Sequence, residues 1–127
     1  MHLTQIPGLY IAVSDLGGKG VFTSSAITKG DLIEICPLII LSAVDTSLIH
    51  KTKLHDYYFV WDDKQKTSAI ALGFGSIYNH SPNPNAEFNV DHSEEYIRFS
   101  ALKNIMAGEE IKTKYLSSDD PEYKLWF

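Results

Sequence analysis

A glycine-rich segment, Gly18-Lys19-Gly20, follows an apolar stretch and could bring backbone N–H groups close to an anionic ligand. A residue without a side chain lets a ligand approach the main chain, and successive N–H groups can then face a carboxylate or a phosphate. The segment also fits an ordinary hairpin turn. It does not fit a dinucleotide-binding fingerprint, because no strand–helix–strand unit follows it. Taken alone, it leaves both a binding role and a simple turn open.

A second polar segment, Asn79-His80-Ser81-Pro82-Asn83-Pro84-Asn85, directly follows the apolar run 69–78. Hydrogen-bonding groups therefore lie at the edge of the expected core, and prolines two positions apart predict a loop. A binding segment and a surface loop carrying a histidine both fit this pattern. A zinc site shared by His80 and His92 is disfavoured, because the ligand spacing and further ligands are missing. We therefore predict no metal site.

The third segment, Gly108-Glu109-Glu110-Ile111-Lys112-Thr113-Lys114-Tyr115, reads as a turn that leads into an alternating strand ending in a tyrosine. A buried phenol at a strand end can orient a ligand, and it can equally be a core or interface residue. The segment alone does not separate these two roles.

Short strands should position these segments. Leu9–Val13 and Val21–Thr23 flank the first glycine cluster and predict a hairpin. Leu32–Leu41 contains Pro37, which predicts two short strands or one strand with a break at its edge. Further strands are expected at Phe59–Trp61, Thr67–Leu72, Ala86–Val90, Tyr96–Leu102 and Ile111–Tyr115. The best helix candidate is Asp45–Tyr58, capped by Thr46 or Ser47. The pattern predicts a mostly β domain.

Length and composition fit one modest domain over residues 1–127. The 44% hydrophobic and 21% charged residues are ordinary for a globular protein. The single cysteine, Cys36, cannot form an internal disulfide, and its apolar surroundings predict a small buried side chain. Neither a signal peptide nor a membrane-spanning segment is visible, which predicts a soluble, intracellular protein, cytoplasmic in a bacterium.

The net charge of −5 argues against direct nucleic-acid binding. No membrane partner is expected, because no spanning segment is visible. It is compatible with a basic protein partner, and equally with a charge carried for solubility alone.

Taken together and in this order, the three segments resemble the SET-domain family. The resemblance runs from about residue 9 to Tyr115 and is closest to the small, free-standing SET proteins of large DNA viruses and bacteria. The family often has cysteine where this chain has Pro82, and Asp where it has Lys114. The resemblance implies a β-clip-like fold of short curled sheets, one or two short helices and a C-terminal pseudo-knot. It further implies transfer of a methyl group from S-adenosylmethionine to protein lysine side chains.

The resemblance also implies residue roles. The cofactor would be held by Gly18, Lys19, Gly20, Asn79, His80 and Trp126. Catalysis would rest on Tyr115, which orients the amine, and on Tyr57, which matches a family Asp-Tyr position. Tyr58, Thr113 and Phe127 would line the substrate channel, and the tail 116–127 would close the site.

A small Thr113 would leave room for more than one methyl group on the lysine. The partner implied is a protein segment bearing lysine, basic in character and histone among the candidates, and a homodimer stays open. The alternative is a catalytically weak SET-like module that binds basic tails.

Overall fold

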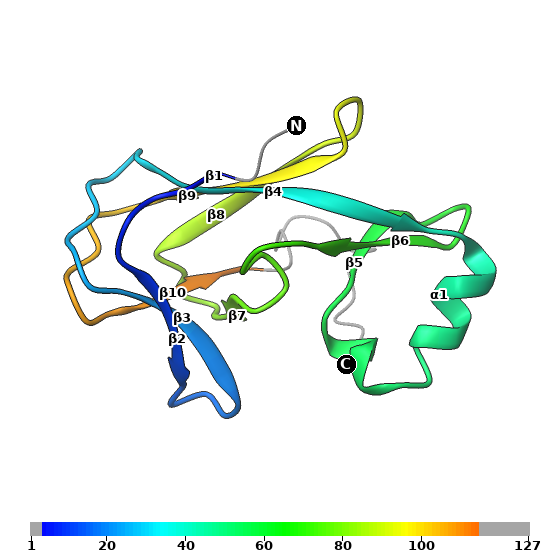
Figure 1. Ribbon diagram of the computed structural model, residues 1–127, viewed down its shortest axis with the longest axis horizontal. Helices are drawn as coiled ribbons and strands as arrows, with labels where there is room; N and C mark the ends of the chain where they lie inside the picture. The colour runs from blue at the N-terminus through cyan, green and yellow to red at the C-terminus, as the bar shows by residue number, and fades with distance from the viewer. Residues whose placement is uncertain (1–3, 115–127) are drawn as a thin grey trace.

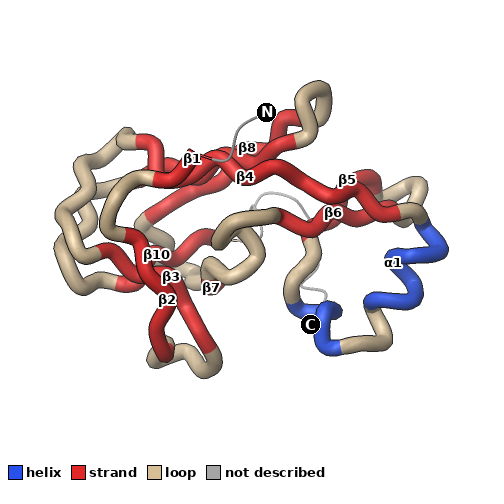
Figure 2. Tube along the Cα trace, in the orientation of Figure 1, coloured by secondary structure: helices blue, strands red, loops and turns tan. Residues whose placement is uncertain are grey.

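The computed structural model describes residues 4–114, in which strands predominate over two short helical segments (Figure 1). The helical segments lie at one end of the molecule, and the loops over residues 24–31 and 102–109 lie at the other (Figure 2). Within residues 4–114, no helix is long and apolar enough to cross a membrane.

The larger sheet has six strands in the order β5-β6-β4-β9-β8, with β1 added beside β4. Every pairing in it is antiparallel. Its strands are β1 (Thr4–Gln5), β4 (Leu32–Leu41), β5 (Phe59–Asp62), β6 (Thr67–Ala71), β8 (Ala86–Asp91) and β9 (Tyr96–Ala101). The hairpin predicted around residues 59–72 and the strands predicted at 86–90 and 96–102 are thereby confirmed.

The smaller sheet has the order β2-β3-β10-β7, and it holds parts of all three polar segments. The predicted hairpin is formed by β2 (Leu9–Val13) and β3 (Lys19–Thr23). Strand β10 (Glu110–Thr113) pairs antiparallel with β3 and parallel with β7 (Asn79–His80). The end of the described chain therefore lies between two segments that precede it by tens of residues, as the predicted pseudo-knot requires.

Strand β4 is continuous through Pro37, so one strand is present, the second of the two predicted alternatives, without the predicted break. Its first part, up to Pro37, pairs with β9, and its second part, from Leu38, pairs with β6. Proline lacks the N–H that a ladder needs. Pro37 lies where β4 changes its partner from β9 to β6, so its missing N–H removes no hydrogen bond from the β4–β9 or the β4–β6 ladder.

The single helix predicted over Asp45–Tyr58 is wrong. An α-helix, α1, covers Ala43–Ile49, and a 3-10 helix, η1, covers Lys53–Asp56. Thr52 separates them, because its hydroxyl donates to the last carbonyl of α1 at 2.6 Å and accepts the N–H of Leu54 at 3.1 Å. One side chain thus ends the first helix and caps the second.

The N-cap of α1 is Ser42, and not Thr46 or Ser47 as predicted. The Ser42 hydroxyl accepts the backbone N–H of Asp45 at 3.1 Å. Ser42 is a good N-cap residue in an extended conformation, so the helix starts earlier than the apolar pattern indicates.

The core lies where the two sheets meet. It combines Val21 and Ile111 of the smaller sheet with apolar residues of the larger one, chiefly Ile33, Ile97 and Phe99. Cys36 is buried among them, as predicted. Burial raises the pKa of its thiol, and the nearby Glu34 carboxyl raises it further.

Candidate cofactor and substrate site

The side-chain amide of Asn79 joins all three polar segments. Its Nδ2 donates to the backbone carbonyl of Lys19 at 3.0 Å and to Oε2 of Glu110 at 2.8 Å. The primary amide has two N–H groups, and both are used by these two bonds. The first and second predicted cofactor segments therefore meet at β10, and the strand that leads toward Tyr115 starts at this junction.

The Glu110 carboxylate lies against the main chain of Gly20. A Cβ atom built on Gly20 would overlap Oε2 of Glu110 and would lie 3.0 Å from Nδ2 of Asn79. The other carboxylate oxygen, Oε1, accepts the hydroxyl of buried Ser14 at 2.6 Å. A side chain at position 20 would therefore have to displace Glu110, and Ser14 is a member of the site that the sequence motifs did not indicate.

The loop after β7 is fastened to β10 by Asn85. Its Nδ2 donates to the carbonyl of Glu110 at 2.8 Å, and its Oδ1 accepts the N–H of Lys112 at 2.8 Å. The N–H of Ser81 adds a bond of 2.8 Å to the carbonyl of Thr113. The Asn85 side chain thus makes the backbone hydrogen bonds that a neighbouring strand would otherwise make to β10. The polar loop therefore holds β10 in register.

His80 pairs in register with Thr113 across the parallel β7–β10 ladder. Burial lowers the pKa of its imidazole, and the positive charge of Lys114 lowers it further. The neutral ring is therefore favoured at neutral pH, which suits contact with a cofactor that carries positive charge.

Thr113 is fully buried, with an exposed fraction of 0%. Its Oγ1 is the one buried side-chain polar atom, among residues 4–114, that has no hydrogen-bond partner. Leaving a buried hydroxyl unpaired costs roughly 1–3 kcal/mol. Such a group at the end of β10 fits a position that meets a ligand.

The two neighbouring tyrosines differ in environment. Tyr58 is 8% exposed, and its hydroxyl lies 2.8 Å from Nδ1 of His50. Burial raises the pKa of this phenol. Tyr57, the C-cap of η1, is 38% exposed. Tyr58 therefore has a protein partner within the helical segments, and Tyr57 has the freer ring.

Three residues with predicted roles, Tyr115, Trp126 and Phe127, lie outside the described residues, as does the tail 116–127. Their roles stay predictions. No cluster of metal-ligating side chains occurs within residues 4–114.

Glu34 is a further buried acid that the sequence reasoning missed. It lies in β4, and its carboxyl bonds to the segment that precedes Asn79. The signal was present, because one acid interrupts the apolar run from Leu32 to Leu41.

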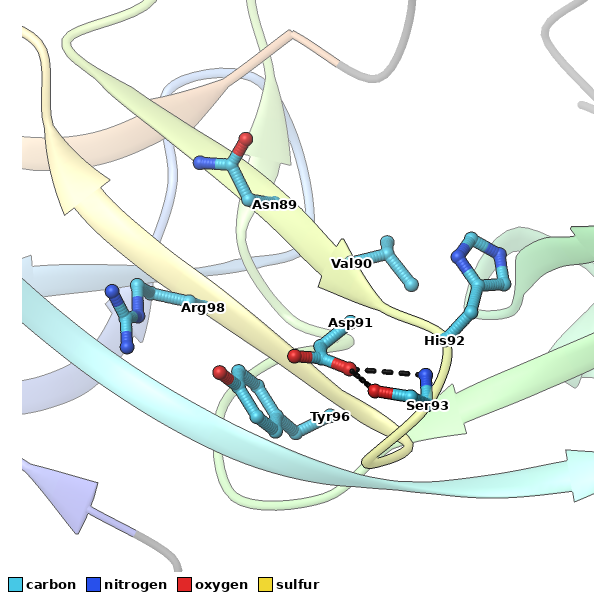
Figure 3. Close-up of a pocket in the computed structure, with 7 residues that line it drawn as sticks. All are labelled: Asn89, Val90, Asp91, His92, Ser93, Tyr96 and Arg98. Atoms are coloured by element: carbon cyan, nitrogen blue, oxygen red, sulfur yellow. Dashed lines mark hydrogen bonds between the residues drawn. The ribbon is translucent and has the colours of Figure 1, made fainter.

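A surface pocket on the β8–β9 hairpin lies elsewhere and contains no predicted site residue (Figure 3). In it the Asp91 carboxylate accepts the N–H of Glu94 and both the N–H and the hydroxyl of Ser93. These bonds lower the pKa of Asp91. The Asp91 carboxylate therefore serves the hairpin turn.

The fold and the three joined segments have counterparts in known proteins. Residues 18–116 match the SET-domain family. The chain is 32% identical over 108 residues to "Histone-lysine N-methyltransferase, H3 lysine-37 specific" of Schizosaccharomyces pombe, covering 84% of this chain and 72% of that protein. It is 28% identical over 100 residues to "Histone-lysine N-methyltransferase Suv4-20" of Caenorhabditis briggsae, covering 77% of this chain but only 30% of that longer protein.

A solved structure is also similar. The crystal structure of a Plasmodium falciparum protein assigned as a histone methyltransferase superposes with a TM-score of 0.67 at 30% identity, covering 87% of this chain and 98% of that one. These relatives come from a fungus, a nematode and a malaria parasite, so the similarity to viral or bacterial members stays a prediction.

The chain belongs to the SET-domain family. It is accordingly a protein-lysine methyltransferase, and S-adenosylmethionine is its methyl donor.

Proposed function

We propose that this methyltransferase acts on a lysine in a basic protein segment, a histone tail in particular. The proposal is supported by the relatives above, two of which are named histone-lysine methyltransferases. It is also supported by the net charge of −5, since an acidic enzyme attracts a basic segment. The region matched to the family, residues 18–116, fits a single domain over residues 1–127.

The cofactor would lie at the junction made by Asn79. Gly18, Lys19 and Gly20 would hold its amino-acid end through the backbone, and Asn79 and His80 would contact its amino-acid and adenine parts. Both Nδ2 hydrogens of Asn79 are already bonded, so the amide oxygen is what this side chain offers the cofactor's ammonium group. Space beside Gly18 is open, because an added Cβ there meets no atom within 4 Å. Trp126 would cover the bound cofactor.

When bound, S-adenosylmethionine supplies an electrophilic methyl group. The protein's part is to present lysine as a neutral amine, although lysine has a reference pKa of about 10.4. A narrow channel with apolar walls would favour the neutral amine by removing water. We assign its walls to Tyr57, Tyr58, Thr113 and Phe127.

Tyr115 would orient the amine and stabilise the polarised methyl group, because its hydroxyl can accept weak C–H···O contacts. It is not assigned the role of a base, since a phenol with a reference pKa near 10 is a poor base at neutral pH. Proximity and orientation would supply most of the rate enhancement.

The single observation that carries this proposal is the pair of bonds from Asn79 to Lys19 and Glu110. The alternative, a module that binds basic tails without catalysis, need not bind S-adenosylmethionine.

Calorimetric titration of S-adenosylmethionine into Asn79→Ala tests the site. Loss of a buried hydrogen-bonding partner typically costs about 1–3 kcal/mol, so affinity should fall about five- to 150-fold. Asn83→Ala is the matched control, because Asn83 is exposed in the same loop and uses only its backbone N–H. Equal affinities in the wild type and Asn79→Ala would refute the assignment. Methylation of a histone-tail peptide, followed by mass spectrometry, tests the substrate.

A further inference from the structure

Glu34 is a charged residue in the middle of the core. It lies in β4 with an exposed fraction of 0%, between the apolar residues Ile33 and Ile35. A buried carboxyl group is costly unless hydrogen bonds satisfy it. An apolar side chain at this position would avoid that cost, so the buried carboxyl group indicates a specific role for Glu34.

Glu34 accepts hydrogen bonds from two separate parts of the chain. Its Oε2 accepts Nε2 of Gln5 at 2.9 Å and the backbone N–H of Phe74 at 3.0 Å. Its Oε1 accepts the hydroxyl of Tyr78 at 2.7 Å. Two of these partners lie in the segment between β6 and β7, which ends directly before Asn79.

The segment between β6 and β7 packs tightly against β4. A Cβ atom on Gly75 would lie 2.6 Å from Cβ of Ala71 and 2.9 Å from Sγ of Cys36. The ring of Tyr78 stacks on Phe99 with 4.2 Å between centroids. The turn therefore has little room to shift, and Glu34 is the polar group that fixes it at both Phe74 and Tyr78.

We infer that Glu34 is a positioning residue for the cofactor site: by holding Phe74 and Tyr78, its carboxylate sets the place from which Asn79 and His80 enter β7. This inference rests on the proposed roles of Asn79 and His80. Glu34 does not touch the cofactor in this arrangement. It acts through the backbone of the two residues that follow Tyr78.

Two variants that remove different donors to Glu34 test the inference. Tyr78→Phe and Gln5→Ala each remove one side-chain donor to Glu34, but only Tyr78 belongs to the segment that carries Asn79. We expect Tyr78→Phe to raise the KM for S-adenosylmethionine about tenfold with little change in kcat at saturating cofactor. Gln5→Ala should keep the wild-type KM within about twofold, while thermal unfolding shows that both variants have lost stability.

Hydrogen exchange of residues 79–85 without cofactor gives a second measurement. Protection should fall in Tyr78→Phe and not in Gln5→Ala, because only the first loosens the anchor of that segment. Glu34→Gln keeps the shape of the side chain but replaces one acceptor oxygen with an NH2 group, which would face other hydrogen-bond donors. This variant should therefore raise KM and lower protection as Tyr78→Phe does. A purely structural role would move KM and exchange equally in the Tyr78 and Gln5 variants, and that result would overturn the inference.

Asn79→Ala separates this inference from the proposed function. If Asn79→Ala binds cofactor weakly while Tyr78→Phe and Glu34→Gln bind normally, the positioning role is wrong and the cofactor site stands. Unchanged cofactor affinity in Asn79→Ala overturns both.

Discussion

The carboxylate of Glu110 occupies the space that any side chain at position 20 would need. Glu110 is held there from two sides, by the hydroxyl of Ser14 and by the amide of Asn79. The glycine of the first motif and the acid of the third are therefore one packing unit.

Gly20→Ala should displace Glu110 and break this unit. We expect a loss of about 1–3 kcal/mol in the free energy of unfolding, typical of an overpacked site, together with weaker cofactor binding. Chemical denaturation and calorimetric titration measure the two effects.

Gly30→Ala is the control for that substitution. Gly30 has φ +90°, and an added Cβ there meets no atom within 4 Å. Its alanine variant should lose about 1–2 kcal/mol through backbone strain and still bind cofactor normally. Normal cofactor affinity in Gly20→Ala would contradict the packing argument.

Tyr115→Phe should lower turnover about five- to 150-fold, as expected for the loss of hydrogen bonds worth about 1–3 kcal/mol. Cofactor affinity should stay close to that of the wild type, because the hydroxyl is assigned to the amine and the transferred methyl group. Single-turnover methylation of a peptide, with circular dichroism to verify folding, measures this. A folded variant with full turnover would remove Tyr115 from the mechanism.

Thr113→Val should raise the free energy of unfolding by about 1 kcal/mol, because it removes a buried hydroxyl that has no partner among residues 4–114. Turnover should fall if that hydroxyl meets the substrate amine.

The small Thr113 side chain also predicts more than one methyl group per lysine in the wild type. Mass spectrometry of a peptide under excess cofactor reads the product, and a wild-type product that stops at one methyl group counts against this role.

The stability of the fold should decrease in mild acid because of His80. Its pKa is lower in the folded protein than the ordinary value of 6.5, so the unfolded chain takes up the proton first as pH falls. The free energy of unfolding should therefore be constant above about pH 7 and decrease below about pH 6.5 until the lowered pKa is passed.

Denaturation between about pH 7 and pH 5 measures that slope. His80→Gln should reduce it, and Lys114→Ala should reduce it in part, since the Lys114 charge is the smaller of the two causes. An unchanged slope in both variants would show that other groups control the pH dependence.

Much of the fold could be predicted from local patterns. Alternation and turn residues located the β2–β3 and β5–β6 hairpins, and alternation located strands β8 and β9. Local patterns left open whether Leu32–Leu41 forms one strand or two, because the answer depends on a change of partner between β9 and β6. The predicted helix is divided at Thr52, because the Thr52 side chain caps both helical segments. The apolar pattern continues across Thr52 and therefore did not reveal the division.

The site could be predicted only in part. The motifs indicated Gly20 and Asn79, and the structure brings these two together. Ser14 and Glu34 were missed, and Asn85 was part of the second segment but was given no role, because these roles come from partners far away in the chain. A polar residue with a distant partner has no periodic pattern that reveals it.

Strand β10 has a consequence for how the enzyme is made. It lies between β3 and β7, and the bond from Ser14 to Glu110 spans 96 positions. A chain leaves the ribosome from its N-terminus, so the earlier hairpins can form while Glu110 is still inside. At that stage the Asn79 amide lacks its acceptor, the Glu110 carboxylate, and the space beside Gly20 that this carboxylate fills in the folded protein is empty. With the cofactor site proposed above, the growing chain would not hold S-adenosylmethionine, and the cofactor would stabilise only a protein whose synthesis has passed β10.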